Sequence, residues 1–186
     1  MIPGWHVKVM GLAAAGFRLS IISNFARLLE EEELETMARI SEIMISIDTH
    51  RPEVQRLIRR RVDIGNILIN MHRVTATASR LGLPKPSFTW SCVVTDKVAL
   101  DLVDYIRFGL ACGVQHFILS NLTKYEDVAD ATNVQHVTTL PDHELRRFVE
   151  LLYQARTIVE DADGILEIYA GLSDTAHSEL ARREAA

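Results

Sequence analysis

Residues 42–48 read Glu-Ile-Met-Ile-Ser-Ile-Asp, a short apolar run typical of a buried parallel strand. Side chains alternate along a strand, so one face carries Ile43, Ile45 and Ile47, and the other carries Met44, Ser46 and Asp48. We expect the isoleucines to pack against helices. The opposite face then presents two polar groups at the C-terminal end of the strand, where α/β barrels carry their sites. A simpler alternative is that Asp48 caps the following helix and Ser46 bonds to backbone.

Short apolar runs alternate with amphipathic segments on both sides of this strand. The pattern predicts further strands at residues 17–22, 88–94 and 116–122, with a possible fifth at 165–169. Helices are expected at residues 3–15, 30–40, 63–82, 98–111 and 142–160, with a short one opened by Pro52. This alternation predicts an α/β fold with a parallel sheet of four or five strands and helical crossovers. Periodicity fits an arc of an α/β barrel and a small doubly wound sheet equally well.

The expected elements belong to one domain. We assign residues 1–170 to a partial α/β barrel domain and residues 171–186 to a polar C-terminal tail, which forms a terminal helix or frays. The connection at residues 123–140 exceeds the usual length of such links, which predicts a functional or mobile segment.

Composition restricts the compartment and the partners. The chain has 186 residues, is 48% hydrophobic and carries a formal net charge of -5, a balance that argues against a nucleic-acid partner. No apolar run approaches the ~20 residues of a membrane span, so no membrane partner is expected. The two cysteines, Cys92 and Cys112, are isolated, and no export signal precedes them. They are typical of reduced thiols in a cytoplasmic protein.

Other expected strands also carry polar side chains. The first strand places Ser20 and Asn24 together, and the third places Thr89, Ser91 and Thr95 on one face. A concave wall of hydroxyls and amides suits a polar small molecule such as a nucleoside. It equally suits a barrel core wetted by a few ordered waters. No metal-ligand spacing or nucleophile motif occurs, so no catalytic or metal-binding residue is assigned.

The arginine run at residues 59–61 allows two interpretations. It is a solvated face, or it meets an anion, since guanidinium matches carboxylate and phosphate geometry.

The order and spacing of these pieces resemble the radical SAM partial barrel. A strand ending in Ser23-Asn24 is followed by an acidic helix, the run Ile45-Ser46-Ile47-Asp48 and a helix with Ile58-Arg59. Residues 90–94 and 110–114 resemble that family's fifth strand and the helix end after it. The similarity covers roughly residues 1–122 and extends more weakly to about residue 170.

The resemblance implies a cofactor and residues to bind it. In the family, polar groups on the Ser-Ile-Asp strand and the following arginine meet the ribose and carboxylate of S-adenosylmethionine. The matching positions are Ser46, Asp48 and Arg59, and Asn24 matches the end of the preceding strand. The family also has an Asn after the fifth strand, where this chain has Asp96-Lys97 instead.

The family's cluster-binding CxxxCxxC motif and its Gly-Gly-Glu motif are both absent from this sequence. A 4Fe-4S cluster needs thiolate ligands, and two isolated cysteines do not supply three. Such a cluster is therefore expected only if the missing segment comes from another chain or a longer reading frame.

Two functional hypotheses follow, with a third, an unrelated small α/β enzyme, behind them. The first is a fragment or split half of a radical SAM enzyme domain. The second is a non-catalytic degenerate barrel that acts as a protein-binding or scaffold module. The first implies a partner polypeptide that carries the missing barrel strands, or self-association through residues 17–22, whose apolar edge lacks protection.

Overall fold

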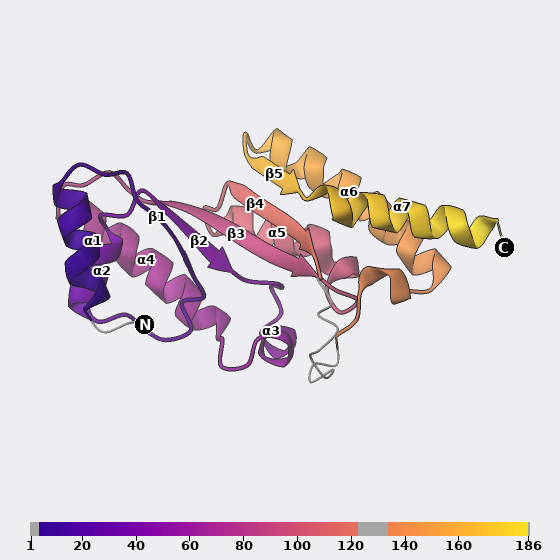
Figure 1. Ribbon diagram of the computed structural model, residues 1–186, viewed down its shortest axis with the longest axis horizontal. Coiled ribbons are helices and arrows are strands. Elements are labelled where there is room, and N and C mark those ends of the chain that lie inside the picture. Colours follow the sequence, from indigo (N-terminus) through magenta and orange to yellow (C-terminus); the bar gives the residue numbers. More distant parts are fainter. Residues whose placement is uncertain (1–3, 123–133, 186) are drawn as a thin grey trace. The chain divides into compact units, whose positions relative to one another are not determined.

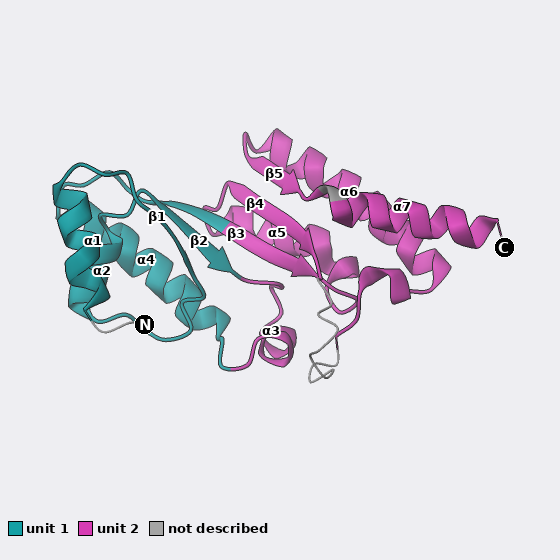
Figure 2. Ribbon diagram, viewed as in Figure 1, with its two compact units in different colours: residues 1–46, 61–89 teal, residues 47–60, 90–186 magenta. Residues whose placement is uncertain are grey.

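Helices and parallel strands alternate along the chain. The computed structural model describes residues 4–122 and 134–185. Its five strands form a parallel sheet in the order β1-β2-β3-β4-β5, with helices in the crossovers (Figure 1). The predicted α/β class and sheet are thus confirmed. The chain divides into two compact units, residues 1–46 with 61–89 and residues 47–60 with 90–186 (Figure 2).

The first unit is built around one parallel strand pair. Its elements are α1 (Trp5–Ala14), β1 (Ser20–Ser23), α2 (Glu31–Met37), β2 (Glu42–Ser46), α4 (Ile64–Arg80) and the first residues of β3 (Ser87–Val94). Strand β1 pairs with β2 so that Ile21 lies opposite Ile43. As expected from the alternation, Ile43 and Ile45 are fully buried.

Local sequence signals set the ends of helix α4. Asp63 caps its start by accepting a hydrogen bond from the Gly65 backbone N–H at 2.7 Å. Past its C-terminus, Gly82 adopts a φ of 65°, a left-handed conformation that glycine reaches without strain. Ile67 and Val74 on the buried stripe are 0% exposed.

The N-terminal part of the first unit is covered poorly. Helix α1 has no buried residue although it is largely apolar, and β1 has none either. Among the residues that the structure describes, no strand pairs with the outer edge of β1.

The second unit has a continuous core. Its elements are α3 (Pro52–Ile58), most of β3, the 3₁₀ turn η1 (Ala99–Asp101), α5 (Leu102–Ala111), β4 (His116–Asn121), the 3₁₀ turn η2 (Val137–Thr139), α6 (Asp142–Asp161), β5 (Ile165–Ile168) and α7 (Ala170–Glu184). Trp90 of β3 packs against Tyr105, Phe108 and Phe117, with ring centroids 5.6, 5.9 and 6.3 Å away. Gly109 permits this packing, because a side chain there would collide with the Phe117 ring.

Helix α7 occupies most of the segment that was expected to be a polar tail. Its Leu172 and Ala176 are 0% exposed. Near its C-terminus, Arg183 donates to Asp142 at 2.6 Å and to the Leu140 carbonyl at 2.9 Å. These contacts tie the helix to the start of α6. Of the long connection, residues 123–133 lie outside the described part of the chain.

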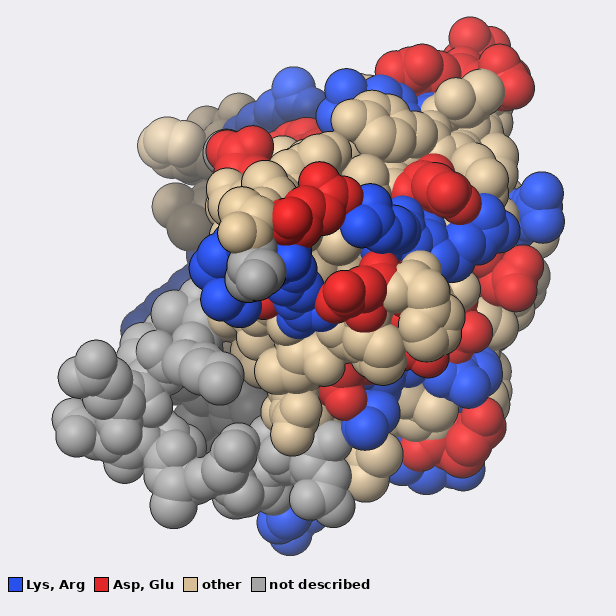
Figure 3. All heavy atoms as spheres, turned by 90° about the vertical axis from the view of Figure 1, so that its right-hand side faces the viewer, with Lys and Arg blue, Asp and Glu red and all other residues tan. Residues whose placement is uncertain are grey.

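The surface mixes charges of both signs. On the face that Figure 3 presents, acidic and basic side chains of the described residues are interspersed. In the part of the chain that the structure describes, no helix combines the length and apolar character needed to cross a membrane.

Candidate functional site

A partly buried ion pair lies just past the C-terminal end of strand β2. Asp48, two residues past the strand, is 1% exposed. Its carboxylate accepts hydrogen bonds from Arg59 Nε at 2.5 Å and Arg59 Nη2 at 3.1 Å. Its Oδ1 also accepts the Val93 backbone N–H at 2.9 Å. The carboxylate therefore fixes both the arginine and the adjacent strand, and it does not cap helix α3 as the simpler interpretation held.

Arg59 presents a fixed positive charge. Its side chain is 30% exposed and stands at the end of helix α3. Burial opposes the charge, but the hydrogen bonds and the negative charge of Asp48 outweigh it, so the pKa of Arg59 is raised above its ordinary value. Nε and Nη2 bind Asp48, and within the described residues the structure gives no partner to the other N–H groups of the guanidinium. A held guanidinium with free donors suits a carboxylate or a phosphate.

The side chains around Asp48 are hydrogen-bonded, and the Cys92 thiol among them is unreactive. The Cys92 thiol donates to the Asp48 carbonyl at 3.3 Å, and the Tyr105 hydroxyl donates to the Ile47 carbonyl at 3.1 Å. Burial, reinforced by the charge of Asp48, raises the pKa of the Cys92 thiol well above its ordinary value. The thiol therefore stays neutral near pH 7 and lacks the thiolate character of a nucleophile or metal ligand.

Gln55 is a site residue that the sequence reasoning missed. Its side chain is 0% exposed, and its Oε1 accepts the backbone N–H groups of Asp48 at 3.0 Å and Thr49 at 3.3 Å. The available signal was weak: Gln55 lies on the short helix between Asp48 and Arg59.

Asn24 lies in the first unit, on a loop that follows β1. It is exposed, and its Oδ1 accepts the Ala26 N–H at 3.2 Å. The next residue, Phe25, is buried with a φ of 45°, a strained conformation for a bulky side chain. Asn70 of α4 holds the loop: it accepts the Leu29 N–H at 3.0 Å and donates to the Arg27 carbonyl at 2.7 Å.

Ser46 ends strand β2 in the same unit and is partly exposed. Of the four residues expected to bind a cofactor, the structure joins Asp48 to Arg59 in the second unit, and Asn24 and Ser46 belong to the first.

A cavity of about 610 Å³ lies in the second unit at the C-terminal ends of its strands. It is lined by Val93, Ser120, Asn121, Leu122, Tyr169, Gly171 and Leu172. Val93 also donates to Asp48, so this residue connects the cavity wall to the ion pair. Asn121 faces helix α7, where its amide donates to the Gly171 carbonyl. The lining combines apolar surface with a few polar groups, as small-molecule sites do.

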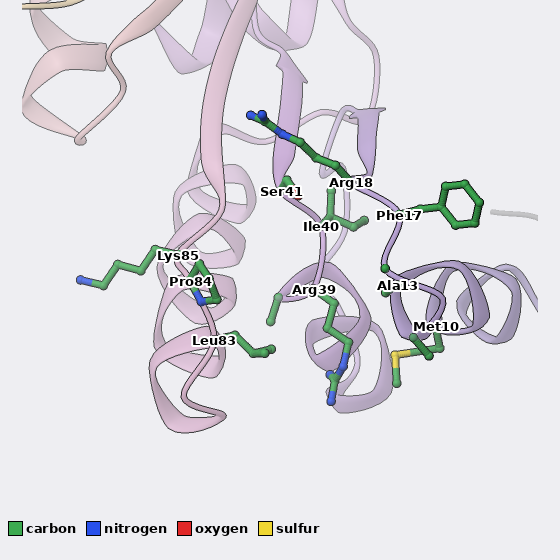
Figure 4. A pocket seen from close by; sticks show the side chains of 13 residues that line it. Met10, Ala13, Phe17, Arg18, Arg39, Ile40, Ser41, Leu83, Pro84 and Lys85 are labelled. Carbon is green, nitrogen blue, oxygen red and sulfur yellow. The ribbon is translucent and has the colours of Figure 1, made fainter.

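A second cavity, of about 590 Å³, lies in the first unit before the strands begin. Three cationic residues line it, but Arg18, Arg39 and Lys85 point in different directions (Figure 4). No shared anion site results. In α/β barrels, this N-terminal end of the strands serves stability and not catalysis.

Solved structures with the same fold are known. A scan of protein-family models finds no match, and neither does a search of curated proteins. SuiB from Streptococcus suis, bound to its precursor peptide SuiA, matches 94% of this chain at 15% identity with a TM-score of 0.64, over 37% of its own chain. SuiB bound to S-adenosylmethionine matches 88% at 12% identity with a TM-score of 0.58, over 33% of its chain. Native anSMEcpe with bound AdoMet matches 82% at 14% identity with a TM-score of 0.55, over 40% of its chain.

The chain has the fold of radical SAM enzymes. The resemblance expected from the order of the motifs is thereby confirmed. The chain spans about a third of the length of SuiB, 35% in the unliganded structure.

Proposed function

We propose that this chain is the S-adenosylmethionine-binding arc of a radical SAM-type barrel. The observation that carries the proposal is the Asp48–Arg59 pair, which holds a partly exposed guanidinium at the C-terminal end of β2. The fold likeness to proteins solved with S-adenosylmethionine supports the choice of ligand.

Each site residue then has a distinct role. Arg59 binds the carboxylate of S-adenosylmethionine through the N–H groups that Asp48 leaves free. Asp48 acts as a positioning residue, since its carboxylate is buried and already accepts three hydrogen bonds. Ser46 and Asn24 belong to the first unit, and their contact with the ligand stays a prediction from the resemblance. The cavity beside Val93 takes the nucleoside part of the ligand.

The chain's own residues do not fit an iron–sulfur cluster. Of the two cysteines, Cys92 is 1% exposed and its thiol is engaged with backbone. Within the described residues, no group of three potential metal ligands occurs. Reductive cleavage of S-adenosylmethionine requires an electron from such a cluster, so a cluster-bearing segment must come from elsewhere.

The uncovered N-terminal part of the first unit is the proposed place for that segment. Phe17 and Ile22 are 62% and 71% exposed, and the outer edge of β1 has no partner strand among the described residues. A polypeptide that adds a strand to this edge would pair with the backbone of β1.

The proposal is tested by measuring S-adenosylmethionine binding with calorimetry. Arg59→Ala should weaken binding by about 1.5–3 kcal/mol, the usual worth of a charged hydrogen bond. Arg60→Ala is the matched control, because Arg60 is exposed and the guanidinium that binds Asp48 is that of Arg59. Equal losses from both variants, or a wild-type chain that does not bind the ligand, would contradict the assignment.

A second candidate function is a protein-binding module without catalysis. It is favoured by the exposed apolar residues of α1 and β1, which suit a protein partner as well as a missing strand. A chain that binds no S-adenosylmethionine but captures a partner through residues 17–22 would support this candidate.

A further inference from the structure

We infer that Gln55 is a positioning residue that fixes the orientation of the Arg59 guanidinium by holding Asp48. This inference rests on the proposed function. Gln55 contacts both members of the ion pair through different atoms. Its side-chain Oε1 accepts the Asp48 N–H at 3.0 Å, and its backbone carbonyl accepts the Arg59 N–H at 2.8 Å. One residue therefore connects Asp48 to the C-terminal end of α3.

The strand end needs this acceptor. Ile47 donates to the Ser91 carbonyl at 3.0 Å, and past it Asp48 and Thr49 turn away from the sheet. Both are 1% exposed, so water does not reach their N–H groups. A buried N–H without an acceptor is costly, and Gln55 satisfies two of them at once.

The other half of the amide supports the same role. Gln55 Nε2 is buried and has no hydrogen-bond partner within the described residues. An unpaired buried donor is unfavourable, and a methionine of similar shape would avoid it. The oxygen of the amide is therefore the useful atom at this position, and its use is to hold the backbone of Asp48.

The orientation of Arg59 matters because the N–H groups of a guanidinium point in fixed directions. Asp48 engages Arg59 through Nε and Nη2 along one edge of the planar guanidinium. If the Asp48 backbone shifts, the carboxylate turns with it, and the remaining N–H groups of Arg59 no longer point at a fixed place. Binding of an anionic group should then weaken while the rest of the ligand site is kept.

The first test needs no ligand. In the full chain, nitrogen-15 NMR should show a slowly exchanging Nε–H signal for Arg59, because that proton is bonded to Asp48. Gln55→Met should shift this signal and speed exchange of the Asp48 and Thr49 amides by about tenfold or more. Leu57→Met, at an exposed position of the same helix, is the control and should change none of them. Unchanged signals in Gln55→Met would overturn the inference.

The second test separates positioning from general disruption. Gln55→Met should weaken binding of S-adenosylmethionine about tenfold. Binding of methylthioadenosine, which lacks the amino-acid carboxylate, should change by less than about twofold. Equal losses for both ligands would show a disrupted fold and overturn the inference. If Arg59→Ala weakens S-adenosylmethionine binding and Gln55→Met does not, the inference fails and the proposed function stands. If Arg59→Ala has no effect, the proposed function fails, and the NMR result still decides whether Gln55 holds the pair.

Discussion

Two regions of the sheet carry the same kinds of side chain with opposite outcomes. On strand β4, Phe117 is 0% exposed and Ile118 is 5% exposed. On and beside β1, Phe17 is 62% exposed and Ile22 is 71% exposed. Strand β4 lies between β3 and β5, whereas β1 ends the strand order. The contrast shows that burial here depends on flanking elements and not on residue type.

The second unit has a continuous core, whereas α1 and β1 of the first unit have no buried residue. The aromatic cluster around Trp90 is complete within the second unit. Helix α1 and strand β1 expose apolar surface that another polypeptide segment would cover, as the proposed function requires. Four experiments each compare a less exposed group with a more exposed one.

The largest effect is expected from a matched pair of phenylalanine substitutions. Phe117→Ala should lower the free energy of unfolding by about 3–5 kcal/mol, because it leaves a cavity beside Trp90 and Tyr105. Phe17→Ala should change it by no more than about 0.5 kcal/mol, as surface substitutions do. Urea denaturation measures both. Similar losses would mean that Phe17 is covered in solution and that the contrast is wrong.

A matched pair of ion-pair substitutions comes next. Asp48→Asn removes the charge that compensates the partly buried Arg59, which should cost about 3 kcal/mol of unfolding free energy. The control is Glu31→Gln, which breaks an equally short pair with Arg80 whose side chains are 66% and 54% exposed. That loss should stay below about 1 kcal/mol. If Asp48→Asn lowered the free energy of unfolding by less than about 1 kcal/mol, the Asp48–Arg59 pair would not be what holds the strand end.

Self-association should respond to charge on the two outer strands differently. Ile22→Lys places a charge on the unprotected edge, and it should weaken association of the chain about tenfold in light scattering. Ile165→Lys, on the other outer strand, is the control. It should do little, since β5 already carries Glu167 on the same face. A wild-type chain that is monomeric at high concentration would remove the need for a covering partner.

The smallest effect concerns the two thiols. Cys112 is partly exposed and should react with iodoacetamide, whereas the buried Cys92 should react at least about tenfold more slowly. Mass spectrometry of the labelled peptides distinguishes them.

The folded pKa of Cys92 lies above that of an unfolded cysteine, about 8.5. Its contribution to stability is therefore complete below that pH and lost as the pH rises beyond it. A stability that stays flat into the alkaline range would contradict this burial.

From the order of residues alone, the sheet and its crossovers were predictable. The alternation in residues 42–48 identified the buried face of β2, and Asp63 and Gly82 marked the ends of α4. These signals are local, because periodicity, capping and left-handed turns depend on residues within a few positions of each other. The count of two cysteines likewise excluded a self-contained three-thiolate cluster site.

The tertiary structure decided how the site residues are used. The sequence predicted Asp48 as a ligand contact, and only the structure shows that its carboxylate accepts hydrogen bonds from Arg59, eleven positions later, and from Val93, forty-five positions later. Gln55 became visible as a site residue only through its bonds to Asp48 and Thr49. The exposure of Ile22 likewise became visible only in the structure, where it pairs with Met44 on the outermost strand pair. Burial and hydrogen-bond pairing are set by groups distant in the chain, which local patterns do not encode.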